Sequence, residues 1–226
     1  MATQGVLARR LARITDGVLC GITSLITGVR PQRAQDLRCP ASRTVFYANH
    51  NSHGDFVLVW ISLPKAWRMQ VRPVAGSDYW LGGKIRRFVI EQVFNGLLVA
   101  RNGGHPQQVI DDMSVALQQG DSLIIFPEGT RNTTDENLLP FKSGIYYLAE
   151  HNPDVAFVPV WLDNINRVLP KGHILPVPLM CAARIGDPIY KLPEEDKATF
   201  LQRTRDALLA LSPRASTDQP QQEHAS

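Results

Sequence analysis

The sequence lacks the features that would place it among nucleic-acid-binding or zinc-binding proteins. Its three cysteines, Cys20, Cys39 and Cys181, are odd in number and widely spaced, and they form no zinc-binding pattern. A reducing compartment is the simplest interpretation of such usage. The net charge of +3 is too small to predict nucleic-acid binding, and no aromatic–basic stacking pattern accompanies it. A mildly basic chain suits an anionic substrate or an anionic membrane surface better.

Several motifs of common enzyme classes are also missing. No Gly-x-Ser-x-Gly sequence is present, so a nucleophilic serine on a strand–helix elbow finds no support. The glycine patterns of phosphate loops and dinucleotide-binding folds are absent as well. His50, His53 and Asp55 match no zinc spacing, and no later cluster of cysteine or histidine completes a site. The sequence therefore predicts no metal.

No apolar run is long enough to span a membrane, but the N-terminal residues 1–38 suggest a membrane-associating segment. The stretch Gly17–Val29 is well short of the roughly 20 residues that a spanning helix needs. Apolar residues at steps of three and four form one helical stripe: Leu7, Leu11, Ile14, Val18, Ile22, Leu25 and Val29. Arginines flank this stripe, which predicts an amphipathic helix or helix pair on the cytoplasmic face of the cell membrane. The alternative is an ordinary helix packed on the domain core.

The remainder of the chain alternates between two kinds of segment. Runs typical of strands are Thr44–Asn49, Val71–Ala75, Leu97–Ala100, Ser122–Phe126, Val155–Leu162 and Met180–Ile185, and runs typical of helices are Ser52–Ser62, Tyr79–Phe94, Pro106–Gln119, Ser143–His151 and Pro193–Leu211. Such alternation predicts one α/β domain, residues 39–211, with a mostly parallel sheet flanked by helices. Residues 212–226 have almost nothing to bury and are predicted to be disordered.

A histidine and a carboxylate lie five positions apart where the first strand gives way to a helix. Ser52 and Asp55 fit a helix start, with Ser52 as the N-cap and an acid three positions later. That structural role does not account for His50, which precedes the cap. If His50 turns back over the first helical turn, Asp55 accepts its Nδ1 proton and Nε2 is left as a general base.

A second motif, Phe126-Pro127-Glu128-Gly129-Thr130-Arg131, follows another predicted strand. Pro127 and Gly129 shape a turn, which is also the structural explanation of the motif. Glu128 can orient Arg131 or bind a substrate hydroxyl, and Arg131 can hold a phosphate bidentately.

Four more residues are predicted to bind substrate. Gly129 and Thr130 complete the turn as substrate-binding positions, and Arg101 and Lys142 are further candidate cations, although such residues are often solvated surface side chains. Because ligands bind beyond the carboxyl ends of parallel strands, His50, Arg101 and Glu128 are predicted to face one crevice.

These residues resemble the signature blocks of the glycerolipid acyltransferases. Asn49-His50-x-Ser52-x-x-Asp55 looks like the first block and Phe126–Arg131 like the third. The resemblance runs from about Thr44 to Pro188 and is strongest to the bacterial 1-acyl-sn-glycerol-3-phosphate acyltransferases, the lysophosphatidic acid acyltransferases.

Two further blocks are matched less closely. The second block of the family usually reads Gly-x-x-Phe-Ile-x-Arg. In this chain Asn95 replaces the glycine, Leu98 and Val99 replace Phe and Ile, and Arg101 is kept. The run Val155–Val160 is similar to the fourth block, an apolar strand that contains a proline.

The resemblance implies acyl transfer from an acyl-CoA or acyl-carrier-protein thioester to the hydroxyl of a lysophospholipid, with phosphatidic acid as the product. It implies that His50 is the base and that Asp55 fixes its tautomer. Arg101 and Arg131, together with Lys142, would hold the phosphomonoester, and no cofactor is needed. Two alternatives remain: a different acceptor, such as another lysolipid or glycerol 3-phosphate, and a membrane-binding protein without catalysis. The intact His50 and Asp55 argue against the second.

Overall fold

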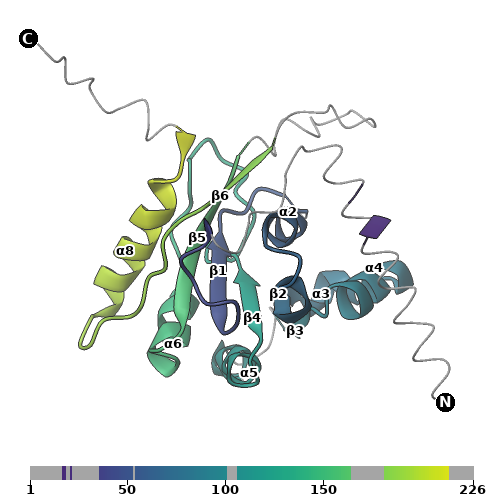
Figure 1. Ribbon diagram of the computed structural model, residues 1–226, viewed down its shortest axis with the longest axis horizontal. Helices are drawn as coiled ribbons and strands as arrows, with labels where there is room; N and C mark the ends of the chain where they lie inside the picture. The colour runs from purple at the N-terminus through teal and green to yellow at the C-terminus, as the bar shows by residue number, and fades with distance from the viewer. Residues whose placement is uncertain are drawn as a thin grey trace, which may run out of the picture.

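A computed structural model describes residues 17–18, 21, 36–52, 54–100, 106–163 and 181–213 of the chain (Figure 1). The strands are β1 (Thr44–Ala48), β2 (Val71–Gly76), β3 (Leu97–Val99), β4 (Ser122–Ile125), β5 (Ala156–Asp163) and β6 (Ala182–Ile185). The helices are α2 (Asp55–Ser62), α3 (Ser77–Trp80), α4 (Lys84–Phe88), α5 (Pro106–Gln118), α6 (Gly144–His151) and α8 (Lys197–Leu209), with a 3₁₀ turn η2 (Arg68–Gln70) and a π-helical turn η3 (Val89–Val93).

The described strands form one six-stranded sheet in the order β3-β2-β4-β1-β5-β6. Every neighbouring pair is parallel except β5 and β6, which are antiparallel. The central strands β1, β4 and β5 are mostly apolar and are buried along almost their whole length, because both faces of the sheet are covered, as parallel sheets require. The α/β class and the mostly parallel sheet are therefore as the sequence predicts.

Helices cover the sheet in two layers, each with its own buried cluster. One layer centres on α2 together with Trp67 and Phe94, and the other on α5, α6 and α8. In Figure 1, α6 and α8 lie on one side of the sheet and α2 on the other. Alternate residues of β1 serve the two layers, with Phe46 in the first cluster and Tyr47 in the second.

The end of β1 is fixed against both of its neighbours in the sheet. Tyr47 pairs in register with Ile125 of β4, so the residues that follow the two strands emerge at the same level. On the other side, the buried Asn49 side chain donates to the Leu162 carbonyl of β5 and accepts from the Leu162 amide, at 3.0 and 2.8 Å. The loops after β1 and β4 are thereby brought together at the carboxyl edge of the sheet.

The structure corrects one predicted helix. Tyr79–Phe94 is not one helix, because Gly82 and Gly83 separate α3 from α4, and Gly83 has an extended backbone. Two consecutive glycines raise the conformational cost of continuing the helix. A π-helical turn, η3, then follows α4 directly.

Several predictions lie outside the described residues: most of the segment 1–38, His53, Arg101, and the tail beyond residue 213. In the part of the chain that the structure does describe, no helix is long and apolar enough to cross a membrane.

Candidate active site

His50 and Asp55 are in contact at the carboxyl end of β1. Nδ1 of His50 lies 2.9 Å from Oδ2 of Asp55, whose side chain is fully buried. The same oxygen accepts the backbone N–H groups of Asn51 at 2.6 Å and Ser52 at 2.8 Å. The carboxylate therefore holds the whole turn and fixes the tautomer with the proton on Nδ1, which leaves Nε2 as a proton acceptor.

The start of α2 differs from the prediction. Helix α2 begins at Asp55 with Gly54 as its N-cap, and the Ser52 hydroxyl accepts the Gly54 amide at 3.2 Å rather than an amide within the helix. Only half of a capping box forms, because Asp55 accepts the Ser52 amide without the reciprocal side-chain bond. The second oxygen of Asp55, Oδ1, is buried without a hydrogen-bond partner in the described part of the chain.

The imidazole of His50 also has an aromatic neighbour. The ring of Phe126, the first residue after β4, stacks on it with centroids 4.2 Å apart and planes 19° apart. Asp55 holds one edge of the imidazole and Phe126 covers one face, so the ring has little freedom to turn. The sequence reasoning did not assign Phe126 this role, although its position in the 126–131 motif marks it as close to the site.

Both side-chain oxygens of Glu128 accept backbone amides, and one of these is the amide of His50. Its side chain is only 1% exposed, and Oε1 accepts the His50 amide at 2.6 Å while Oε2 accepts the Leu139 amide at 2.9 Å. Burial raises the pKa of the Glu128 carboxyl, against the opposing effect of these two hydrogen bonds. The prediction that Glu128 orients Arg131 or binds a substrate hydroxyl is not supported, because both of its oxygens face backbone amides inside the protein.

Asn132 completes the hold on His50 from the same loop. Its amide donates to the His50 carbonyl at 2.6 Å, and its side-chain oxygen accepts the Thr134 amide at 2.9 Å. The loop after β4 therefore binds the backbone of His50 at both its N–H and its C=O. Asn132 was not predicted from the sequence, because an asparagine after a turn motif gives no indication of which distant residue it will contact.

Two cavities meet at His50. The smaller, of about 300 Å³, is lined by Thr130 and Arg131 together with Asp78 and the aromatic residues Tyr79 and Trp80. The larger, of about 620 Å³, is walled mainly by apolar side chains from β2, β3 and α5: Val74, Val99, Val109, Ile110 and Met113. Of the predicted cations, Arg131 lines the smaller cavity and Lys142 the larger.

The neighbouring turn residues Gly129 and Thr130 line different cavities. Gly129 has a positive φ of 70° and lines the larger cavity, whereas Thr130 lines the smaller one. Asp78 was not predicted from the sequence as a site residue. It lies just after β2, however, and ligands bind beyond the carboxyl ends of parallel strands. Among the described residues, no cluster of His, Cys, Asp and Glu could hold a metal ion.

A base on one strand-end loop, held by a second strand-end loop between a polar and an apolar cavity, is an arrangement suited to group transfer between two substrates. Comparison with known proteins defines the class. The model of the family described as Acyltransferase matches residues 30–163, more than half of the chain, and the protein therefore belongs to this family of glycerolipid acyltransferases.

Individual relatives agree with this membership. The chain is 29% identical over 182 residues to the 1-acyl-sn-glycerol-3-phosphate acyltransferase of Limnanthes douglasii, a match that covers 75% of this chain and 59% of the plant protein. It is 32% identical over 111 residues to the enzyme of the same name from Saccharomyces cerevisiae, covering 46% of this chain and 36% of the yeast protein. The chain thus spans about three fifths of the plant relative's length.

A solved structure shares the fold. The crystal structure of the 1-acyl-sn-glycerophosphate (LPA) acyltransferase from Thermotoga maritima matches with a TM-score of 0.61 over 90% of this chain and 76% of that chain. Sequence identity is 16%, so this likeness concerns the fold alone.

Proposed function

We propose that the protein transfers an acyl group from an acyl-CoA or acyl-carrier-protein thioester to the free hydroxyl of 1-acyl-sn-glycerol 3-phosphate, giving phosphatidic acid. The observation that carries this proposal is the 2.9 Å contact between His50 and Asp55 at a point where a polar and an apolar cavity meet. Relatives named 1-acyl-sn-glycerol-3-phosphate acyltransferase support the choice of substrate.

The reaction follows from the tautomer of His50. Nε2 of His50 takes the proton of the acceptor hydroxyl while the hydroxyl oxygen attacks the thioester carbonyl carbon. The carbon–oxygen bond forms, the carbon–sulfur bond then breaks, and the imidazolium returns its proton to the leaving thiolate. Asp55 stabilises the imidazolium in between. A positioned base of this kind contributes about 10²–10⁴ in rate.

The two cavities suit the two substrates. The smaller cavity offers the Arg131 guanidinium and the Thr130 hydroxyl to a phosphomonoester, and arginine binds such groups bidentately. The larger, apolar cavity suits the hydrocarbon chain of the donor. The acceptor and the donor then reach His50 from two different cavities. Holding them next to the base in this way supplies part of the rate enhancement. From its place in the sequence, Arg101 is proposed as a second phosphate ligand.

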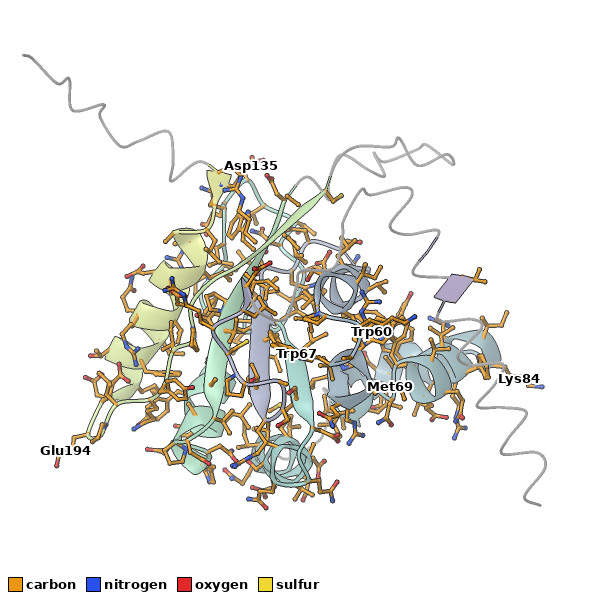
Figure 2. The ribbon with its side chains drawn as sticks, viewed as in Figure 1. Trp60, Trp67, Met69, Lys84, Asp135 and Glu194 are labelled. Carbon is orange, nitrogen blue, oxygen red and sulfur yellow. The ribbon has the colours of Figure 1, made fainter. Side chains whose placement is uncertain are left out.

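We also propose that the protein binds the surface of the membrane from its cytoplasmic face. The N-terminal stripe supports this from the sequence, and α4 supports it from the structure. Ile85 of α4 is 81% exposed and lies between basic residues. Figure 2 shows its neighbour Lys84 projecting away from the body of the protein. Helix α4 follows α3, whose residues Tyr79 and Trp80 line the smaller cavity, so a lipid acceptor would enter close to the leaflet.

One observation favours a second candidate acceptor. Asp78 shares the smaller cavity with Arg131, and a carboxylate there would repel a phosphate dianion but attract an ammonium group. A lysolipid whose head group carries both a phosphate and an amine fits this pair of charges. Glycerol 3-phosphate, which lacks the first acyl chain, is the other alternative acceptor.

A direct assay tests the proposal. Purified protein is given palmitoyl-CoA or palmitoyl-acyl-carrier protein with lysophosphatidic acid, lysophosphatidylethanolamine or glycerol 3-phosphate, and His50→Ala protein serves as the control. Phosphatidic acid formation that depends on His50 is the expected result. Turnover of lysophosphatidylethanolamine in its place would support the second candidate. Absence of transfer to all three acceptors would overturn the proposed function.

A further inference from the structure

Lys142 lies apart from the other basic residue of the site. The resemblance to the family assigns Lys142 and Arg131 to one phosphate group, but the two line different cavities, with Lys142 in the larger and Arg131 in the smaller. Within the part of the chain that the structure describes, Lys142 is the one lysine, arginine or acidic residue that lines the larger cavity. Lys142 therefore lies in the cavity that is proposed to hold the acyl donor.

The path of the Lys142 side chain is set by the loop that also holds His50. Its amide donates to the Pro127 carbonyl at 2.8 Å, and Pro127 directly follows Phe126, whose ring stacks on His50. Its Cγ and Cε lie 3.1 and 3.7 Å from the place that a Cβ on Gly129 would occupy. The lysine stem thus runs over the bare backbone of Gly129, beside the loop that holds the base.

The ammonium group of Lys142 has no carboxylate partner among the described residues. The cavity that it lines is otherwise mainly hydrocarbon, and an acyl chain has no group that uses a positive charge. The reacting end of the donor does, because negative charge develops on the thioester carbonyl oxygen when the acceptor oxygen attacks. The phosphates of CoA lie a whole pantetheine arm away from the sulfur, whereas this carbonyl must lie next to His50.

We propose that Lys142 is a further catalytic residue, which stabilises the negative charge on the thioester carbonyl oxygen during acyl transfer. The inference rests on the proposed function. As the acceptor oxygen bonds to the carbonyl carbon and its proton passes to His50, the carbonyl π electrons move to oxygen, and the Lys142 ammonium lies beside this oxyanion. The electrons return as the carbon–sulfur bond breaks. Lys142 keeps its proton throughout.

The test replaces charge while keeping the stem. Lys142→Met retains a long unbranched side chain over Gly129 but removes the ammonium, and Lys142→Arg restores a positive charge. Lys65→Met, at an exposed lysine beyond the far end of α2, is the matched control. Each variant is assayed with palmitoyl-CoA and with palmitoyl N-acetylcysteamine thioester, which carries the same acyl chain and thioester but no phosphate.

We expect Lys142→Met to lower kcat about 10²-fold with both donors, near the lower end of the loss seen when one oxyanion donor is removed. Both KM values should stay within about twofold of the wild type, Lys142→Arg should recover part of the rate, and Lys65→Met should behave as wild type. A loss confined to palmitoyl-CoA would assign Lys142 to the CoA phosphates and overturn the proposal. A rise in acceptor KM alone would return it to the acceptor phosphate and overturn it equally.

The proposed function and the role of Lys142 fail in distinguishable ways. Wild-type protein that acylates no lysolipid contradicts the function itself. Wild-type protein that does so, with Lys142→Met as active as wild type, contradicts only the role of Lys142. A Lys142→Met protein whose thermal unfolding matches wild type but whose kcat is reduced with both donors supports the role.

Discussion

The substitution Glu128→Gln tests how the candidate base is held in place. It keeps the size of the side chain but turns one carboxylate oxygen into an NH₂ group, which donates and does not accept. Glu128 accepts two backbone amides, those of His50 at 2.6 Å and Leu139 at 2.9 Å, and it is 1% exposed. A glutamine can accept only one of the two, so one buried N–H will face an NH₂ group without water to replace the lost bond.

The energetic cost follows from these contacts. Leaving one N–H unsatisfied inside the protein costs about 1–3 kcal/mol. The charge of the carboxylate adds nothing to this cost, because burial disfavours the ionised form of Glu128 and raises its pKa. We therefore expect Glu128→Gln to lower the free energy of unfolding by about 1–3 kcal/mol. For a chain of this size, each 1 kcal/mol lowers Tm by about 2–4 °C, so a fall of about 2–12 °C is expected.

Activity should fall by more than the loss of stability explains. His50 is bound through its backbone N–H by Glu128 and through its carbonyl by Asn132, so losing the first bond lets the base shift. A displacement of about 1 Å costs on the order of 10²-fold in rate. Since Glu128 is 1% exposed and lines neither of the two cavities, kcat should fall while both KM values stay close to wild type.

The pH dependence of stability gives the same substitution a second signature. Burial raises the pKa of Glu128 in the folded protein above its ordinary 4.5, so the folded state binds more protons than the unfolded state between these two values. The stability that Glu128 contributes through this shift is fully present below about pH 4.5 and is lost as pH rises through the folded-state pKa. The stability advantage of the wild type over Glu128→Gln should therefore shrink as pH rises through this window.

Urea unfolding at several pH values and steady-state kinetics at a fixed pH measure these effects. The exposed Glu136→Gln, on the same loop, is the matched control and should change neither Tm nor kcat. Glu128→Gln protein with unchanged Tm and a raised acceptor KM would refute the reasoning, because that pattern belongs to a residue that touches the acceptor. A stability deficit that grows as pH rises would contradict the direction of the pKa shift.

Further substitutions separate the remaining roles. His50→Ala should lower kcat about 10²–10⁴-fold, and retention of more than about a tenth of kcat would contradict the role of the base. Asp55→Asn, which can keep an oxygen facing His50 but loses the charge, should retain measurable activity. Arg131→Ala should raise the KM of lysophosphatidic acid more than that of the donor, because Arg131 lines the smaller cavity; equal changes in both KM values would refute the phosphate assignment. Ile85→Glu should weaken sedimentation with anionic liposomes yet spare activity on a short-chain soluble acceptor, while Val115→Glu, at a 50% exposed position on α5, should bind as wild type. Equal binding by both variants would exclude α4 from the membrane contact.

The features of this protein that could be predicted from the sequence are the local ones. The strands β1, β4 and β5 are mostly apolar runs between turn residues, and such short runs favour buried strands when helical segments alternate with them. The contact between His50 and Asp55 is also local, because the two residues are only five positions apart in the chain. Short-range geometry restricts such pairs so strongly that spacing alone predicts them.

Contacts between residues far apart in the chain could not be predicted from the sequence and depend on the folded structure. Glu128 and His50 are 78 positions apart, and their bond exists because β1 and β4 are parallel neighbours in one register. The folded segment between β4 and α6 places Arg131 and Lys142 in different cavities, although the sequence suggested one phosphate site for both. Residue type and periodicity predict that a polar side chain lies at a strand end. They do not predict the direction in which this side chain points or the group that it contacts. Both depend on how segments that are distant in the sequence pack against one another.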